Sequence, residues 1–118
     1  SNFSGNEDIT IIIGTAFTGL NSFPTVPPIF KAAQNCHWEQ SGAYTGEISV
    51  DMIKDCGADY VILGHSERRH IFNETDKQIN LKVKSVLDKG LNPILCVGET
   101  LLQRNENITN EILKIQLL

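Results

Sequence analysis

Chemically versatile side chains are concentrated in one short stretch, YVILGHSERRHIF, at residues 60–72. An apolar run ends at Gly64 and is followed at once by two histidines, a serine, a glutamate and two arginines. Parallel α/β folds place their chemistry just past the carboxyl ends of strands. His65 occupies that position, directly before a residue that can begin a helix. We therefore take His65 as the leading candidate for a catalytic side chain.

The helix expected directly after His65 decides which chemistry its imidazole suits. Unpaired N–H groups and the positive end of the helix dipole disfavour an imidazolium. A neutral imidazole can still donate a hydrogen bond to a carbonyl oxygen. We predict that Ser66 is the N-cap and not a nucleophile, because Arg68 replaces the second glycine of a G-x-S-x-G turn. By position alone, His65 also fits a surface histidine in a charged loop.

The sequence contains partial matches to motifs that bind metal or phosphate, but none of these motifs is complete. His65 and His70 lack the i, i+4 spacing of two zinc ligands on one helix face. The H-x-E at residues 65–67 is not followed by the P-C-x-x-C of a deaminase. The stretch GTAFTGL has P-loop spacing, but a leucine stands where the phosphate-binding lysine is required. We expect no metal and no cofactor.

Composition places the chain among ordinary globular domains. Its 118 residues, 41% hydrophobic and 20% charged, suit one domain with a packed core. The net charge of −4 leaves no basic stripe, so neither nucleic acid nor a membrane is the expected partner. No apolar run reaches the roughly 18 residues of a membrane span. Cysteines 36, 56 and 96 form no C-x-x-C pair, which favours a reducing cytoplasm over a disulfide framework or a zinc ribbon.

Apolar runs rich in branched residues alternate with segments of helical period, which is the pattern of successive βα units. The expected strands are Ile9–Ile13, Phe30–Gln34, Tyr60–Leu63 and Ile94–Val97.

Capping residues predict the helices between these strands. Thr75 and Gln78 have capping-box spacing at the start of one helix, which Gly90 ends. Ser49 can cap a second helix that Gly57 ends, and a third is expected from about residue 109. The stretch TGLNSFPTVPP is expected to be helical by alternation, although its prolines limit it to about two turns.

The spacing of the strands fits two architectures. The last three begin roughly 30 residues apart, and a (β/α)₈ barrel of about 250 residues averages about 31 per unit. The chain then holds about four units, which would leave two strand edges unpaired. An open doubly wound sheet could instead be complete at this size. The first residue is serine and the last helical pattern stops at Leu118, so we predict that both ends are truncated.

Three segments resemble, in order and spacing, the triosephosphate isomerase family: AAQNCHWEQSGAYTGEIS (32–49), YVILGHSERRHIF (60–72) and ILCVGETLLQR (94–104). The resemblance implies an α/β TIM (β/α)₈ barrel, of which residues 1–118 form a partial domain with strands two to five. It implies a cytoplasmic enzyme of glycolysis and gluconeogenesis. This aldose–ketose isomerase interconverts a small phosphorylated triose, dihydroxyacetone phosphate, with D-glyceraldehyde 3-phosphate through an enediol(ate), without cofactor or metal.

The resemblance also assigns roles to residues around the histidine. It implies that His65 is the electrophile that polarises the substrate carbonyl. Glu67 matches a family glutamate close enough to influence the site, and Ser66 caps the following turn. Arg68 and Arg69 are expected to form ion pairs that hold the loop.

A second matched segment implies that the protein forms a homodimer. Thr45, Gly46 and Glu47 match a loop that projects into the other subunit of a homodimer. Cys96 and Glu99 match residues that we expect to serve packing and loop support.

Several parts of the family's site have no counterpart in this sequence. These are the asparagine and lysine after the first strand, the glutamate base and lid after the sixth, and the phosphate-binding glycines after the seventh and eighth. The chain alone is therefore expected to be inactive. Two alternatives stay open: a non-catalytic half-barrel that self-associates or binds a partner, and an independent doubly wound domain that binds a phosphorylated ligand.

Overall fold

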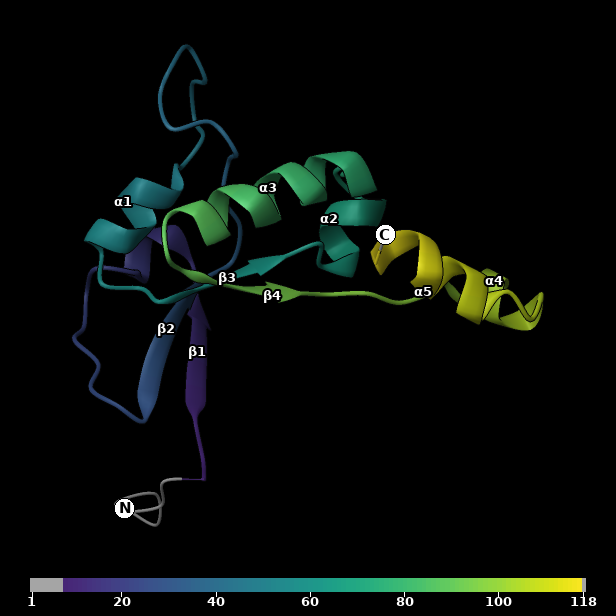
Figure 1. Ribbon diagram of the computed structural model, residues 1–118, viewed down its shortest axis with the longest axis horizontal. Coiled ribbons are helices and arrows are strands. Elements are labelled where there is room, and N and C mark those ends of the chain that lie inside the picture. Colours follow the sequence, from purple (N-terminus) through teal and green to yellow (C-terminus); the bar gives the residue numbers. More distant parts are fainter. Residues whose placement is uncertain (1–7, 118) are drawn as a thin grey trace.

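A single parallel sheet organises the chain. The computed structural model describes residues 8–117, without the side chains of residues 101 and 102. Its strands are β1 (Ile11–Thr15), β2 (Ile29–Ala33), β3 (Tyr60–Leu63) and β4 (Asn92–Leu95). They lie in the order β1-β2-β3-β4, so each strand pairs with the next one along the chain (Figure 1). A doubly wound sheet reverses its strand order at a switch point, and no reversal occurs among these strands.

β1 lies two residues later than expected, β2 one residue earlier and β4 two residues earlier, whereas β3 has the expected bounds. β1 continues to Thr15 because the ladder with β2 extends through Gly14 opposite Ala32 and Thr15 opposite Ala33. β4 begins at Asn92 rather than at Ile94, with Pro93 inside the strand and opposite Val61. Proline is tolerated there because β4 pairs on one side only among the described residues.

The expected caps define the main helices. Ser49 Oγ accepts a hydrogen bond from Met52 N at the start of α1 (Val50–Asp55). Thr75 and Gln78 form the full capping box of α3 (Asp76–Asp88), and α5 is Thr109–Leu117. A short helix, α4 (Leu101–Asn105), was not predicted. Its capping-box signal was present, because Thr100 and Gln103 exchange the two hydrogen bonds of that motif.

The prediction of a helix after the first strand is wrong. Only one turn of 3₁₀ helix, η1 (Phe17–Gly19), forms there, because the prolines that follow remove N–H donors and disfavour helical conformations before them. A buried lysine replaces the missing donors. Lys31 Nζ donates to the carbonyls of Leu20, Phe23 and Cys56 at 2.8, 2.9 and 2.8 Å. The irregular crossover is thereby anchored to the end of α1.

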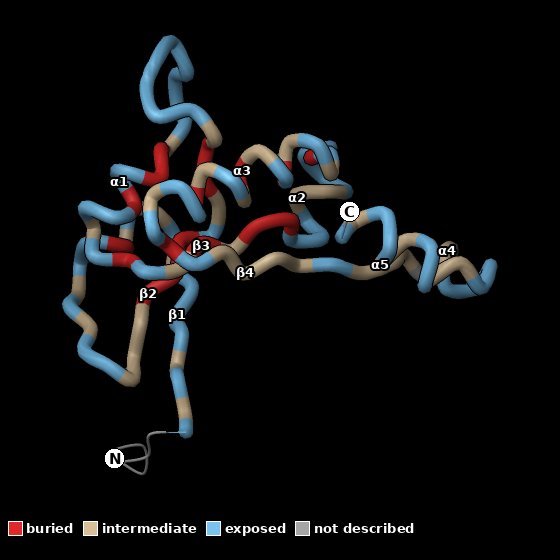
Figure 2. Tube along the Cα trace, in the orientation of Figure 1, coloured by how far each residue is buried: buried red, intermediate tan, exposed pale blue. Residues whose placement is uncertain are grey.

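The core fills only one face of the sheet. Val61 and Leu63 of β3 are fully buried and belong to one apolar cluster with Ile53 of α1 and with Ile79 and Val86 of α3 (Figure 2).

Alternation along β3 turns Tyr60 and Ile62 toward the opposite face, where they are only half-buried. On the edge strand β1, Ile12 and Ile13 are 36% and 42% exposed. Helices α1 and α3 cover the face with Val61 and Leu63, and within residues 8–117 the opposite face is left partly exposed.

Candidate functional site

A glycine turn delivers His65 to the carboxyl edge of the sheet. β3 ends at Leu63, and Gly64 adopts φ 72°, a left-handed conformation that L side chains rarely take. A Cβ at Gly64 would lie 2.9 Å from Arg69 Nη2 and 3.1 Å from the carbonyl oxygen of Cys96. The tight turn places His65 directly at the start of α2 (Ser66–His70). Both the backbone conformation and the space therefore require glycine before the histidine.

The imidazole of His65 caps the helix itself. Nδ1 accepts a hydrogen bond from Glu67 N at 3.2 Å, so the prediction that Ser66 is the N-cap is wrong. Ser66 is the first residue of α2 because the ring nitrogen takes the acceptor role that a hydroxyl usually fills. Only an unprotonated Nδ1 can accept this bond, so the bond is compatible with a ring that carries its proton on Nε2. The side chain of His65 is 49% exposed, so its ring lies at the surface of the site.

Glu67 lies beside the histidine without bonding to its ring. Its Oε2 atom is 3.9 Å from His65 Nδ1, beyond hydrogen-bond range, and its side chain is 75% exposed. The backbone of Glu67, through its N–H, is what fixes the ring.

An open cavity of about 450 Å³ lies beside His65, at the carboxyl ends of β1, β2 and β3. That volume falls in the range of small-molecule sites, roughly 300 to 1,000 Å³. The cavity is lined by Gly14, Ala16, Phe17, Gln34, Asn35, Ile62, His65, Glu67, Arg68 and Phe72. Sequence reasoning missed Gln34 and Asn35, although they follow β2 directly, as His65 follows β3. Their shared position at strand ends was the available signal.

The two arginines hold the site together, as predicted. Arg68 Nε pairs with Glu74 Oε2 at 2.9 Å, and Arg69 Nη1 pairs with Asp76 Oδ1 at 2.6 Å. Arg69 also donates to the carbonyls of Gly64 and Cys96 at 2.7 and 3.2 Å. One guanidinium therefore ties the ends of β3 and β4 to the start of α3.

A buried ion pair lies behind the arginines. Glu74 Oε2 is 2.6 Å from Lys82 Nζ, and their side chains are only 3% and 5% exposed. Lys82 also donates to Asn35 Oδ1 at 3.0 Å, which links α3 to the end of β2. Burial favours the neutral acid, but the hydrogen bonds from Lys82 and Arg68 outweigh it and hold the pKa of Glu74 below its usual value.

Thr45, Gly46 and Glu47 lie in a projecting loop (residues 38–47) between β2 and α1, which extends away from the sheet (Figure 1). All three are exposed, and none lines the cavity beside His65. The structure therefore does not bring them to the histidine within this chain. Glu47 reaches back to the loop base, where its Oε2 is 3.8 Å from His37 Nδ1.

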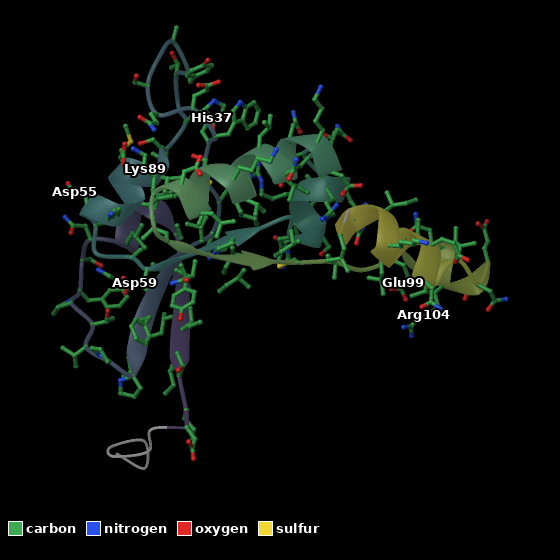
Figure 3. All side chains as sticks on the ribbon, in the orientation of Figure 1. His37, Asp55, Asp59, Lys89, Glu99 and Arg104 are labelled. Carbon is green, nitrogen blue, oxygen red and sulfur yellow. The ribbon has the colours of Figure 1, made fainter. Side chains whose placement is uncertain are left out.

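Glu99 supports the connection after β4. Its Oε1 accepts from Arg104 Nε at 2.6 Å, and this hydrogen bond holds the pKa of Glu99 below its usual value (Figure 3).

The three cysteines are free, and Cys36 is buried. Burial raises the pKa of the Cys36 thiol to about 12, so this residue is not a nucleophile at neutral pH.

Two properties of residues 8–117 bear on other functions. No helix within residues 8–117 is long and apolar enough to cross a membrane. In the same range, no group of three histidine, cysteine, aspartate or glutamate side chains is placed to hold a metal ion.

A parallel sheet in sequential strand order, with its site at the carboxyl ends, is the arrangement of part of a (β/α)₈ barrel enzyme. The profile of one family, described as triosephosphate isomerase, matches residues 1–118. The chain belongs to the triosephosphate isomerase family.

Individual relatives agree with the profile. Triosephosphate isomerase of Alkaliphilus oremlandii is 59% identical over 86 residues, which cover 73% of this chain and 35% of the relative. That of Alkaliphilus metalliredigens is 46% identical over 113 residues, 93% of this chain and 46% of the relative. That of Taenia solium is 50% identical over 107 residues, 91% and 43% respectively. The chain thus spans less than half the length of these relatives.

Proposed function

We propose that this chain contributes His65 as the electrophile of a triosephosphate isomerase that interconverts dihydroxyacetone phosphate and D-glyceraldehyde 3-phosphate through an enediol(ate), without cofactor or metal. The observation that carries the proposal is the hydrogen bond from Glu67 N to His65 Nδ1. It leaves the Nε2 proton free to polarise a carbonyl oxygen in the adjacent cavity. A neutral histidine beside a helix start is the established electrophile of this family.

The same hydrogen bond suits the proton exchange that follows. When Nε2 releases its proton to an enediolate oxygen, electron density on the ring rises. The N–H of Glu67 at Nδ1 stabilises that density, because it is already aimed at the ring and needs no reorganisation. His65 can then take a proton back from the neighbouring oxygen. The reaction needs no imidazolium at any step.

Proton transfer between the two carbons needs a separate base. Glu67 is a poor candidate, since its carboxylate lies toward Nδ1 and not toward the donor nitrogen of His65. The family's base and its phosphate-binding glycines match no residue of this sequence. We therefore propose that the 118-residue chain by itself has no measurable isomerase turnover.

We also propose that the complete enzyme is a cytoplasmic homodimer, in which Thr45, Gly46 and Glu47 contact the second subunit. Support comes from the exposure of the projecting loop, whose Tyr44 is 44% exposed. These residues do not approach His65 in their own chain, which leaves the loop free to reach another copy. Free cysteines are consistent with a reducing compartment.

A chimeric enzyme tests the role of His65. In this chimera, residues of this chain replace the matched segment of the Alkaliphilus metalliredigens relative. The relative then supplies the rest of a barrel around His65. We expect turnover in a coupled assay, and a fall in kcat of about 10²- to 10³-fold for His65→Gln, the usual cost of removing one such donor.

His70→Gln is the matched control, because His70 is exposed on the same short helix and does not line the cavity of about 450 Å³. It should leave kcat nearly unchanged, and both variants should unfold near the parent temperature. Equal kcat in the parent and in His65→Gln would contradict the proposed role.

One observation favours a second candidate function, a non-catalytic half-barrel that self-associates. Among the described residues β1 and β4 each have one unpaired edge, and Ile12 and Ile13 are exposed on β1. Two copies could pair these edges into an eight-stranded arrangement. Sedimentation of the 118-residue chain over a range of concentrations tests this. A strictly monomeric chain would exclude the second function and leave the first untouched.

A further inference from the structure

A second, smaller cavity of about 170 Å³ lies between the base of the projecting loop and α3. Its lining comes from His37, Trp38, Glu47, Arg68, Phe72, Glu74, Gln78 and Lys82. Among the described residues, only two buried side-chain polar atoms have no hydrogen-bond partner, His37 Nε2 and Glu74 Oε1. Both residues line this cavity. Leaving such atoms buried and unpaired is costly, so their presence in one cavity calls for a physical account.

The ring of His37 is held from several sides (Figure 3). It packs against the rings of Trp38 and Tyr44, with centroids 4.3 and 4.6 Å away, and its side chain is 10% exposed. Nδ1 faces Glu47 Oε2 at 3.8 Å, while the backbone N–H donates to Ile48 O at 2.8 Å. Every one of these partners belongs to the projecting loop or follows it directly. The state of this ring therefore bears on how the loop is held.

A neutral His37 ring carries a single N–H, so it can donate toward Glu47 or toward Glu74 but not toward both. The tautomer that turns its N–H toward Glu47 leaves Nε2 as an acceptor, and the Glu74 carboxylate is also an acceptor. Two acceptors cannot satisfy each other. A proton added at Nε2 makes it a donor, which can pair with Glu74 Oε1 directly or through one water. The same proton gives the ring a positive charge opposite Glu47.

Two acidic and two basic side chains line the cavity with His37. Glu47 of the loop and Glu74 before α3 favour a charged ring, while Arg68 of α2 and Lys82 of α3 oppose it. Both cations are already engaged by Glu74 Oε2, at 2.9 and 2.6 Å.

We propose that His37 is a proton-dependent latch for the projecting loop: uptake of a proton by His37 ties Glu47, at the end of the loop, and Glu74, before α3, to one ring at the base of the loop, and loss of the proton loosens the loop. Histidine is the side chain that ordinarily changes charge between pH 5 and 8. The loop is therefore held more tightly toward the acidic end of that range. Because Thr45 to Glu47 are the proposed subunit contact, the latch would also adjust assembly, a consequence that rests on the proposed function. The latch itself does not require a dimer.

Amide hydrogen exchange of the 118-residue chain, followed by NMR from pH 5 to pH 8, tests the latch. Two amides report on the loop: His37 N–H, which donates to Ile48 O, and Glu47 N–H, which donates to Tyr44 O. After correction for intrinsic exchange, we expect their protection factors to rise about twofold to fivefold on acidification, the strength of a partly exposed ion pair. His37→Gln should abolish the rise, and His70→Gln, which alters an exposed histidine, should retain it.

Glu47→Gln is a second variant that leaves the core intact, because its side chain is 49% exposed. It should reduce the pH dependence even if His37→Gln does not fold. Protection independent of pH in the parent chain, or an undiminished rise in Glu47→Gln or in His37→Gln, would overturn the latch. Sedimentation of the same samples reports assembly separately, so failure of the dimer proposal remains distinguishable from failure of the latch.

Discussion

The ends of β2 and β3 each present a histidine near the same edge of the sheet, but the two regions hold it in different ways. His65 is half-exposed, and its ring is fixed by a backbone N–H only two residues away. His37 is nearly buried, with a carboxylate at Nδ1 and an unpaired Nε2. A neighbouring residue orients the ring of His65, whereas residues from distant segments of the chain surround the ring of His37. The arrangement at His65 suits a ring that keeps one orientation for catalysis, and the arrangement at His37 suits a response to pH.

The largest expected effect comes from Glu74, because both regions depend on it. Glu74→Gln removes the carboxylate that Arg68 and Lys82 share and leaves the Lys82 ammonium buried without a counter-charge. We expect a loss of about 3 to 5 kcal/mol in the free energy of unfolding, measured with urea. The control is Asp51→Asn, which breaks the more exposed Asp51–Lys89 pair and should cost less than about 1 kcal/mol. Equal costs would show that the buried pair is not special.

The pH dependence of the same pair has a definite sign. The pKa of Glu74 is lowered in the folded chain, so its ion pairs stabilise the fold above the unfolded-state value of 4.5. That stabilisation is lost as the pH falls through the lowered folded value. Urea midpoints of the parent should therefore drop on acidification below about pH 4.5, and those of Glu74→Gln should drop less. Parallel profiles would contradict the assignment.

An intermediate effect on stability is expected from substitutions at two glycines, one in each region. Gly64 and Gly46 both have positive φ, 72° and 88°. A Cβ at Gly64 would meet Arg69 and the carbonyl of Cys96, while at Gly46 it would meet nothing within 4 Å. Each alanine substitution should cost about 1 to 2 kcal/mol through backbone strain. Gly64→Ala should cost more and should also shift the NMR signals of His65, whereas Gly46→Ala should leave them in place.

The smallest effect is expected at Glu67. Its carboxylate is 75% exposed and 3.9 Å from the ring, and the cap bond uses its backbone N–H. Glu67→Gln should therefore change the free energy of unfolding by less than about 0.5 kcal/mol and keep the Nε2–H tautomer of His65. A change of tautomer in this variant would mean that the side chain, not the backbone, orients the ring.

The features that could be predicted from the sequence are those that depend on interactions between residues close together in the chain. Ser49 and Thr75 cap their helices through bonds to residues three positions away, and these two motifs were recognised. The same spacing at Thr100 and Gln103 was overlooked. The position of His65 followed from the strand before it. The cap at His65 was misassigned to Ser66, because a ring nitrogen is not among the usual capping groups.

Longer-range interactions lay outside such reasoning. Lys31 Nζ reaches the carbonyl of Cys56, and Lys82 reaches Asn35, through contacts between elements far apart in the chain. The cavity shared by His37 and Glu74 likewise exists only after the projecting loop, α2 and α3 are packed together. These contacts leave no periodic trace in the sequence, so only the structure reveals them.

The protonation of His65 is the most direct test of the account. Nitrogen-15 NMR of the folded chain at neutral pH distinguishes the two tautomers and the imidazolium. The account predicts a neutral ring with the proton on Nε2 and an unprotonated Nδ1 that accepts from Glu67 N. A ring that carries its proton on Nδ1, or a charged ring, would contradict the proposal that His65 is poised to polarise a carbonyl.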